Sequence, residues 1–128
     1  MTYLLDTHTI IWAGSGDRRL GAKARAILAD ESAVFLVSAA SAWEIATKVR
    51  LGKLPEAMAL EADFLQSMSN AGFALIPVTV EDALRSGRLQ GAHRDPWDRM
   101  IVAQALARDI PVISNDKQLD GFGVRRIW

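Results

Sequence analysis

Short, continuously apolar runs alternate along the chain with longer segments in which apolar residues recur at helical spacing. Runs such as Tyr3–Asp6 and Ile110–Ser114 are typical of strands buried on both faces of a sheet. Because helical segments separate the runs, we expect a parallel sheet with right-handed crossovers. Strands are predicted at 3–6, 33–37, 73–78 and 110–114, with a short edge strand at 124–128. The pattern therefore predicts an α/β fold, with a four- to five-stranded parallel sheet flanked by helices.

Apolar spacing and residues that favour helix ends predict the helices. Ser38 is expected to cap a strong helix that reaches about Leu51, and Gly52 follows its end. Leu60–Asn70 is predicted to form a single helix. Its inward face is predicted to consist of Leu60, Phe64, Leu65 and Met68. The remaining helices are predicted at 7–13, 21–30, 80–86 and 96–108.

The composition predicts one folded domain over residues 1–128, since half of the residues are apolar and the mean hydropathy is +0.10. The chain has no cysteine, which excludes disulfides, thiolate metal ligands and a cysteine nucleophile, and fits a reducing cytoplasm. Basic and acidic residues number 15 each, so a large sequence-independent grip on nucleic acid is not expected. No apolar stretch approaches the roughly 18 residues of a membrane span. We expect a cytoplasmic protein without a signal peptide.

Four acidic residues stand where an α/β fold brings distant segments together. Asp6 closes the first apolar run and Asp116 follows the last long one, and ligands of open α/β sheets bind at the carboxyl ends of strands. Asp98 lies in the densest polar segment, His93–Arg99. Glu44 shares a helix face with small and polar residues, namely Ala40, Ser41 and Thr47. Such a face is too polar for a core and would let a metal or a backbone approach closely.

Clustered carboxylates repel one another, so one pKa would rise unless a cation entered the site. Oxygen ligands suit Mg²⁺ or Mn²⁺ rather than zinc. The chain has no P-loop, no G-x-S-x-G elbow and no H-E-x-x-H helix. Arg94 and Arg99 stand beside a helix start and suit the binding of a phosphate. The predicted metal ligands and catalytic residues are Asp6, Glu44, Asp98 and Asp116.

Each acid also has a purely structural explanation, which for Asp116 is its place in a polar, turn-like loop. Asp6 can cap a helix that begins at Thr7, and Glu44 can form an i,i+4 surface pair with Lys48. Asp98 falls at the third position of its helix, where an acid can complete a capping box. Thr7 either starts a helix or orients Asp6 through a hydrogen bond.

The polar neighbours of these acids are expected to play supporting roles. Asp95 precedes a proline and is well placed to cap a helix, and Ser38 is expected to act first as a cap. Ser114 lies in a turn-like segment just past a buried strand. His8 and His93 give weak evidence for a site, and either is expected to pack or to contact solvent.

These segments resemble the motifs of PIN-domain ribonucleases, and in particular those of the VapC-type toxins of bacterial toxin–antitoxin pairs. The likeness spans essentially the whole chain, and its motifs appear in the order of the family. They are Tyr3–His8, Ser38–Ala46, His93–Ala105 and Ser114–Asp116.

The resemblance implies a three-layer fold and a dimeric, metal-dependent endoribonuclease that a VapB-like antitoxin holds inactive. The family's acidic positions match Asp6, Glu44, Asp98 and Asp116, and all four are intact here. Asp95 is a neighbour rather than a central ligand, and Thr7 and Ser114 match hydroxyl positions. The carboxylates are expected to hold one or two Mg²⁺ ions, which would activate a water to attack an RNA phosphodiester. Arg94 or Arg99 is expected to hold the scissile phosphate.

Two other function classes stay open. A phosphoacceptor receiver domain has similar length and strand order, but it needs an acidic pair after the first strand, where only Asp6 stands. A non-enzymatic interaction module would use the acids as helix caps and surface charge. A metal titration that produces no change near the four acids would favour the interaction module.

Overall fold

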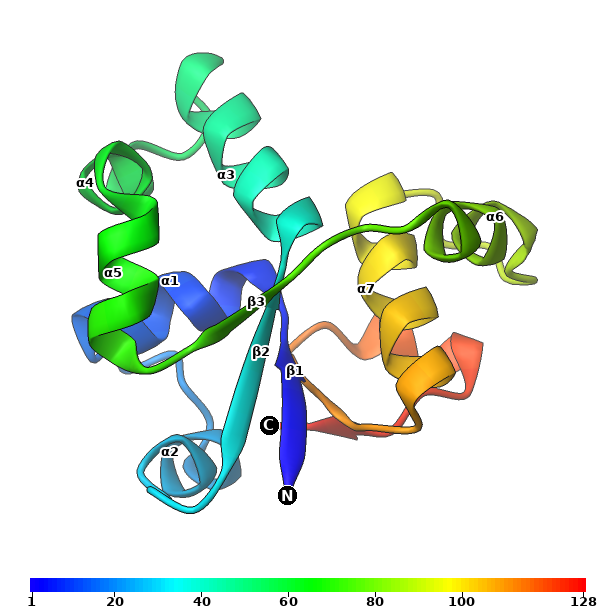
Figure 1. Ribbon diagram of the computed structural model, residues 1–128, viewed down its shortest axis with the longest axis horizontal. Helices are drawn as coiled ribbons and strands as arrows, with labels where there is room; N and C mark the ends of the chain where they lie inside the picture. Colours follow the sequence, from blue (N-terminus) through cyan, green and yellow to red (C-terminus); the bar gives the residue numbers. More distant parts are fainter.

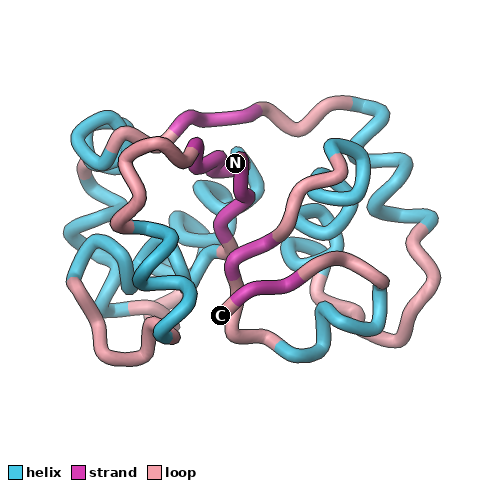
Figure 2. The backbone as a smooth tube through the Cα atoms, turned by 90° about the horizontal axis from the view of Figure 1, so that it is seen from below, coloured by secondary structure: helices cyan, strands magenta, loops and turns pink.

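The computed structural model describes all 128 residues, Met1–Trp128. A five-stranded parallel sheet has the strand order β3-β2-β1-β4-β5. Helices lie on both sides of this sheet in Figures 1 and 2. The strands are β1 (Thr2–Leu5), β2 (Val34–Ser38), β3 (Ala74–Ile76), β4 (Val112–Ile113) and β5 (Arg126–Ile127). The predicted three-layer α/β fold and parallel sheet are confirmed.

The helices connect successive strands and occur close to where the sequence places them. Ser15-Gly16 ends the first one, with Gly16 in the left-handed conformation that favours glycine. The helices are α1 (Thr7–Ser15), α2 (Ala22–Leu28), α3 (Ala39–Arg50), α4 (Met58–Ala62), α5 (Phe64–Ala71), α6 (Val80–Arg88) and α7 (Pro96–Arg108). Two short 3-10 helices are η1 (Pro55–Ala57) and η2 (Lys117–Phe122).

Alternation of side chains along the central strand divides the core between the two faces of the sheet. Tyr3 and Leu5 pack with residues of α1, α2 and α5, whereas Leu4 packs against α7 and η2. Because both faces are covered, β1 is apolar at every position from Tyr3 to Leu5. The first polar residue after this strand, Asp6, stands at the edge of the core and is still buried.

The single helix predicted over Leu60–Asn70 is wrong. Asp63, with φ −135° and ψ 42°, separates α4 from α5. Phe64 and Met68 pack inward as predicted, but Leu65 is 72% exposed. One residue along a helix turns the side chain by about 100°, so Leu65 cannot share the inward face of Phe64 and Met68.

The helices are also too short or too polar for a bilayer, since none meets the length and hydropathy of a membrane span.

Candidate active site

The candidate site lies where β1 and β4 end. Leu5 of β1 stands opposite Ile113 of β4, so the residues that follow, Asp6 and Ser114, emerge side by side. The Ser114 hydroxyl donates a 2.6 Å hydrogen bond to Oδ2 of Asp6 and accepts one of 3.0 Å from the backbone N–H of Asp116. One serine therefore ties together two of the predicted acids, which are 110 positions apart in the chain.

Asp6 is only 5% exposed. Its Oδ1 accepts a 2.8 Å hydrogen bond from the backbone N–H of Thr7, so the side chain also caps α1. Burial raises the pKa of Asp6 because it disfavours the charged form. The hydrogen bonds from Ser114 and Thr7 oppose this rise, and the charge of Glu44 adds to it. The helix-cap explanation is thus correct, and Asp6 still lies with the other predicted acids, which we call the acidic cluster (Asp6, Glu44, Asp98 and Asp116).

Glu44 faces α1 from the middle of α3 and is buried. The hydroxyl of Thr7 donates a 2.6 Å hydrogen bond to Oε1 of Glu44 and lies 3.0 Å from the Ser41 hydroxyl. Thr7 therefore orients Glu44 through its hydroxyl, and it reaches Asp6 only through its backbone. The small, polar face predicted on this helix is where the start of α1 comes close to α3.

Lys48 forms the predicted ion pair with Glu44. The pair is not fully on the surface, because Glu44 is buried and only Lys48 is partly exposed. The Lys48 ammonium lies 2.5 Å from Oε2 of Glu44. Burial alone would lower the pKa of Lys48, but the bond to Glu44 and the nearby charges of Asp95 and Asp98 outweigh it and raise the pKa. Lys48 supplies positive charge at one side of the cluster.

Two helices begin at the site, and both are capped as predicted. Ser38 accepts a 3.0 Å hydrogen bond from the backbone N–H of Ala40 at the start of α3. Asp95 accepts one of 3.0 Å from the backbone N–H of Asp98 at the start of α7. The carboxylate of Asp98 does not complete a capping box, and it turns instead toward the imidazole of His93.

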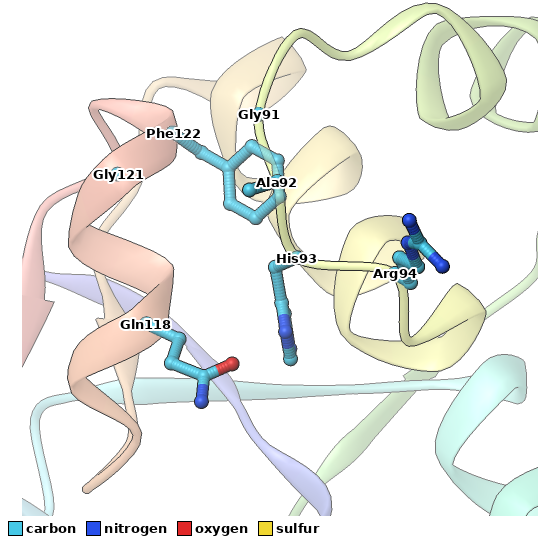
Figure 3. A pocket seen from close by; sticks show the side chains of 7 residues that line it. All are labelled: Gly91, Ala92, His93, Arg94, Gln118, Gly121 and Phe122. Atoms are coloured by element: carbon cyan, nitrogen blue, oxygen red, sulfur yellow. The ribbon is translucent and has the colours of Figure 1, made fainter.

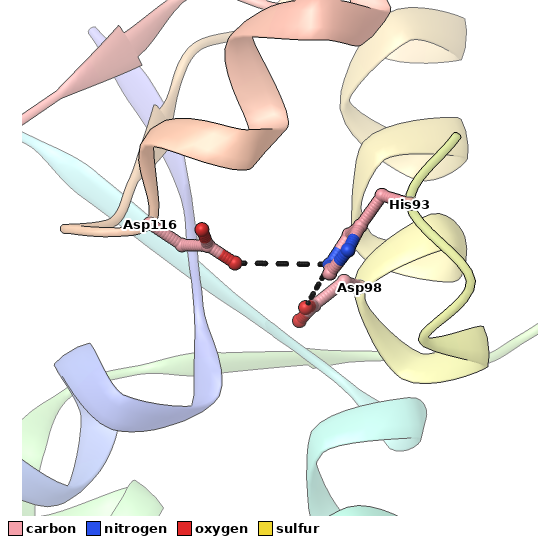
Figure 4. A group of neighbouring side chains, drawn as sticks. All are labelled: His93, Asp98 and Asp116. Carbon is pink, nitrogen blue, oxygen red and sulfur yellow. Dashed lines mark hydrogen bonds and ion pairs between the residues drawn. The ribbon is translucent and has the colours of Figure 1, made fainter. Parts of the chain in front are cut away.

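Figure 4 shows His93 between Asp98 and Asp116. Its Nε2 lies 2.7 Å from Oδ2 of Asp98 and 3.7 Å from Oδ2 of Asp116. One ligand atom from each residue lies within 4.8 Å of the other two. His93 was expected only to pack or to contact solvent, and the one signal for a role in the site was its position in the dense polar segment before α7.

The protonation of this group follows from crowding and burial. Burial is the main reason that the pKa of Asp98 rises to about 7, and the charge of Asp6 is the next. Smaller increases come from Asp95 and Glu44, and the bond to His93 opposes them. That bond also raises the pKa of His93, against a smaller effect of burial. The charges of Asp6 and Glu44 therefore act on Asp98, although neither residue belongs to the group of His93, Asp98 and Asp116 in Figure 4.

The two predicted phosphate-binding arginines differ in their surroundings. Arg99 donates hydrogen bonds to the backbone carbonyls of His93, at 3.0 Å, and Leu89. Its guanidinium lies over the ring of Phe122, 5.5 Å from the centroid. Arg94 is exposed and is free to meet an anion. Arg99 is thus committed to holding the loop that carries His93.

The donors of the cluster suit a divalent cation. Asp98 and Asp116 share one group with His93, and Asp6 and Glu44 lie close enough for their charges to act on Asp98. The positive charge beside these acids comes from Lys48 and from His93 when it is protonated. Carboxylate oxygens are the ligands that Mg²⁺ and Mn²⁺ prefer. A bound cation would also offset the repulsion that adds to the burial-driven rise in the pKa of Asp6 and Asp98. The expected all-oxygen ligand set has one neighbour of another type, the imidazole of His93.

The family model of the PIN domain matches residues 3–124. The chain belongs to the PIN domain family. No curated protein sequence matched the chain in a separate comparison.

Solved structures with the same fold include a toxin and a toxin–antitoxin complex. VapBC2 from Rickettsia felis, bound to a promoter DNA fragment, is 15% identical, with a TM-score of 0.69 over 99% of this chain and 98% of its own. VapC20 from Mycobacterium tuberculosis, a toxin that cleaves the sarcin-ricin loop, is 19% identical, with a TM-score of 0.68 over 95% of both chains. FitAcB from Neisseria gonorrhoeae is 21% identical, with a TM-score of 0.67 over 98% and 96%. The resemblance read from the motifs is confirmed for the PIN family and its fold.

In this PIN domain the four predicted acids come from four separate segments of the chain. Two residues connect three of them. The Ser114 hydroxyl bonds the Asp6 carboxylate and the backbone N–H of Asp116, and Thr7 bonds Asp6 through its backbone N–H and Glu44 through its hydroxyl. Asp98 joins them electrostatically and through His93.

Proposed function

We propose that this PIN domain is an endoribonuclease that depends on Mg²⁺ or Mn²⁺ and hydrolyses RNA phosphodiester bonds. The observation that supports this most strongly is the gathering of Glu44, Asp98 and Asp116 around the buried Asp6, whose pKa is raised mainly by burial and further by the charge of Glu44. Such a group is costly to bury without a cation, so its presence points to a function rather than to stability.

The proposed ligands are Asp98 and Asp116, with Asp6 and Glu44 binding directly or through water. A divalent cation held there supplies charge neutralisation on the phosphodiester and lowers the pKa of water. Ser114 and Thr7 orient Asp6 and Glu44 through their hydroxyls. His93 holds Asp98 in place through Nε2.

Arg94 is the proposed contact to the RNA phosphate, since it is exposed next to His93. Arg99, predicted for the same task, acts through the loop instead, because its guanidinium is bonded to two loop carbonyls. With zero net charge, the chain is expected to hold RNA through this local group rather than through a broad basic surface.

We further propose that the protein is the toxin of a toxin–antitoxin pair, is dimeric and is inhibited by a VapB-like antitoxin. Support comes from the fold shared with the toxin VapC20 and with a toxin–antitoxin complex from Klebsiella pneumoniae. A cytoplasmic location stays a prediction from the cysteine-free composition.

The experiment that tests the proposal is incubation of total RNA with the protein in Mg²⁺, in Mn²⁺ or in EDTA, followed by mapping of the new 5′ ends. We expect discrete cuts with either metal and none in EDTA. An Asp6→Asn protein, prepared in the same way, controls for contaminating nucleases. Equal cleavage by both proteins would refute the proposed active site.

A further inference from the structure

A hollow of about 370 Å³ opens between η2 and the loop that precedes α7, as Figure 3 shows. The loop side consists of Gly91–Arg94, and the η2 side consists of Gln118, Gly121 and Phe122.

This hollow adjoins the acidic cluster on two sides. His93 lines the hollow and its Nε2 faces Asp98. Gln118 lines it as well, and its backbone N–H donates a 3.0 Å hydrogen bond to Oδ1 of Asp116. If a phosphate of an RNA chain lies at the carboxylates, the adjacent nucleotide would therefore lie at the mouth of the hollow.

The walls combine a flat apolar surface with a free hydrogen-bonding group. The ring of Phe122 forms one wall, and the side-chain amide of Gln118 points toward His93 without a hydrogen-bond partner in the protein. An amide offers both a donor and an acceptor, as the edge of a base requires. Arg94 and His93 line the hollow and no carboxylate does, so its charge suits an anionic strand.

The shape of this wall depends on Gly91. Its φ of 147° is rarely adopted by residues with a side chain, and a Cβ here would lie 2.7 Å from Cε1 of Phe122. The loop therefore approaches the ring as closely as it does only because this position is glycine.

We propose that this hollow binds one nucleobase of the RNA next to the scissile phosphate, and that the Gln118 amide reads the edge of that base. The proposal rests on the nuclease function proposed above and adds a determinant of cleavage preference to it. Gln118 would determine which base is preferred, and the base would pack against the Phe122 ring.

The first test compares Gln118→Ala with the wild-type protein on total RNA, with cut sites mapped by sequencing. We expect the preference for the favoured base beside the cut to fall roughly tenfold, the worth of one or two hydrogen bonds. Gln66→Ala on α5 is the matched control, since Gln66 is exposed and bonds only Asn70. An unchanged preference in Gln118→Ala would overturn the proposal while leaving the nuclease function intact.

A second test does not require cleavage. Amide shifts are followed while ribonucleoside 5′-monophosphates, or ribose 5-phosphate as the base-free control, are added in Mg²⁺. The proposal expects base-dependent shifts at Gly91–His93 and Gln118–Phe122, weakened in Gln118→Ala. Equal shifts with ribose 5-phosphate, or none in these segments, would count against a base site. Base-dependent shifts in a protein that cuts no RNA would support the hollow and refute the nuclease.

Discussion

The hydroxyl of Ser114 donates a 2.6 Å hydrogen bond to Oδ2 of Asp6, across 108 positions of sequence. The contact exists because β1 and β4 are neighbours and end at the same level. It fixes one carboxylate oxygen of Asp6, while the backbone N–H of Thr7 fixes the other. Asp6 is thereby held in one orientation before any ligand arrives, and preorganisation of this kind favours both binding and catalysis.

Replacing Asp6 by asparagine should abolish cleavage and leave the fold intact. The amide oxygen can still accept from the backbone N–H of Thr7, and the amide NH₂ can donate to the Ser114 hydroxyl. The charge that a cation needs is lost, so we expect a loss of activity of about 100-fold or more. Metal-free stability should not fall, because the substitution removes a buried charge whose pKa is raised. Far-UV circular dichroism and a thermal melt report the fold, and an RNA assay reports activity. A folded variant with full activity would remove Asp6 from the mechanism.

Metal-free protein should lose thermal stability as the pH rises from 5 to 8. The folded pKa values of Asp6 and Asp98 lie above the ordinary 3.8, and that of Asp98 is about 7. The folded state therefore binds more protons than the unfolded state, and the free energy of unfolding falls as these carboxyls ionise. His93 also lowers the stability as the pH rises. Its raised pKa means that the protonated imidazole stabilises the folded state, and this stabilisation is lost as the pH rises through that pKa.

Melting temperatures in EDTA at pH 5, 6, 7 and 8 measure this trend. Asp98→Asn should flatten it, and Mg²⁺ should raise the melting temperature most at pH 8, where the ligands are deprotonated. Carboxyls with a lowered pKa, such as Asp17, complete their contribution below about pH 5 and do not enter this window. A melting temperature in EDTA that rises with pH would contradict the assignment.

Lys48→Met should destabilise the metal-free protein by about 1–3 kcal/mol, because it leaves the buried Glu44 without its cationic partner. Millimolar Mg²⁺ should recover part of this loss, since a bound cation can compensate the same carboxylate. Lys23→Met on α2 is the control, as Lys23 is exposed and pairs with no acid, and it should change stability by less than about 0.5 kcal/mol. Urea denaturation with and without Mg²⁺ measures all four values. A loss in Lys48→Met that Mg²⁺ leaves unchanged would show that the cation does not reach Glu44.

Gln104→Ala should destabilise the fold by about 2–4 kcal/mol through lost packing and unpaired polar groups. The Gln104 amide is fully buried and donates to Oδ2 of Asp82 at 2.9 Å and to the carbonyl of Pro77 at 3.0 Å. These bonds join α6 and the end of β3 to α7, away from the acids. Gln66→Ala should have little effect on the same denaturation curve. A similarly small change in Gln104→Ala would mean that the buried bonds add little to stability.

Prediction from sequence succeeded where a local signal was strong. Asp6 and Asp116 follow apolar runs, and the carboxyl ends of parallel strands meet at one edge, so their approach could be anticipated. The caps Ser38 and Asp95 are likewise local, because each needs only the N–H groups of the next turn. The helix over Leu60–Asn70 was predicted as one piece because the break at Asp63 has no proline or glycine to mark it.

The order of strands and helices, the burial of the central strand and the presence of four acids at element ends were determined by the sequence alone, because they depend on periodicity and on neighbours a few positions away. The tertiary structure decided which atoms meet. The Thr7 hydroxyl could have bonded Asp6 or Glu44, and only the approach of α1 to α3 selected Glu44. His93 joined the acids because its loop, held by Arg99, folds back toward η2. Such contacts depend on how segments far apart in the chain pack together. A pattern of neighbouring residues does not specify how close the side chains of two remote segments come.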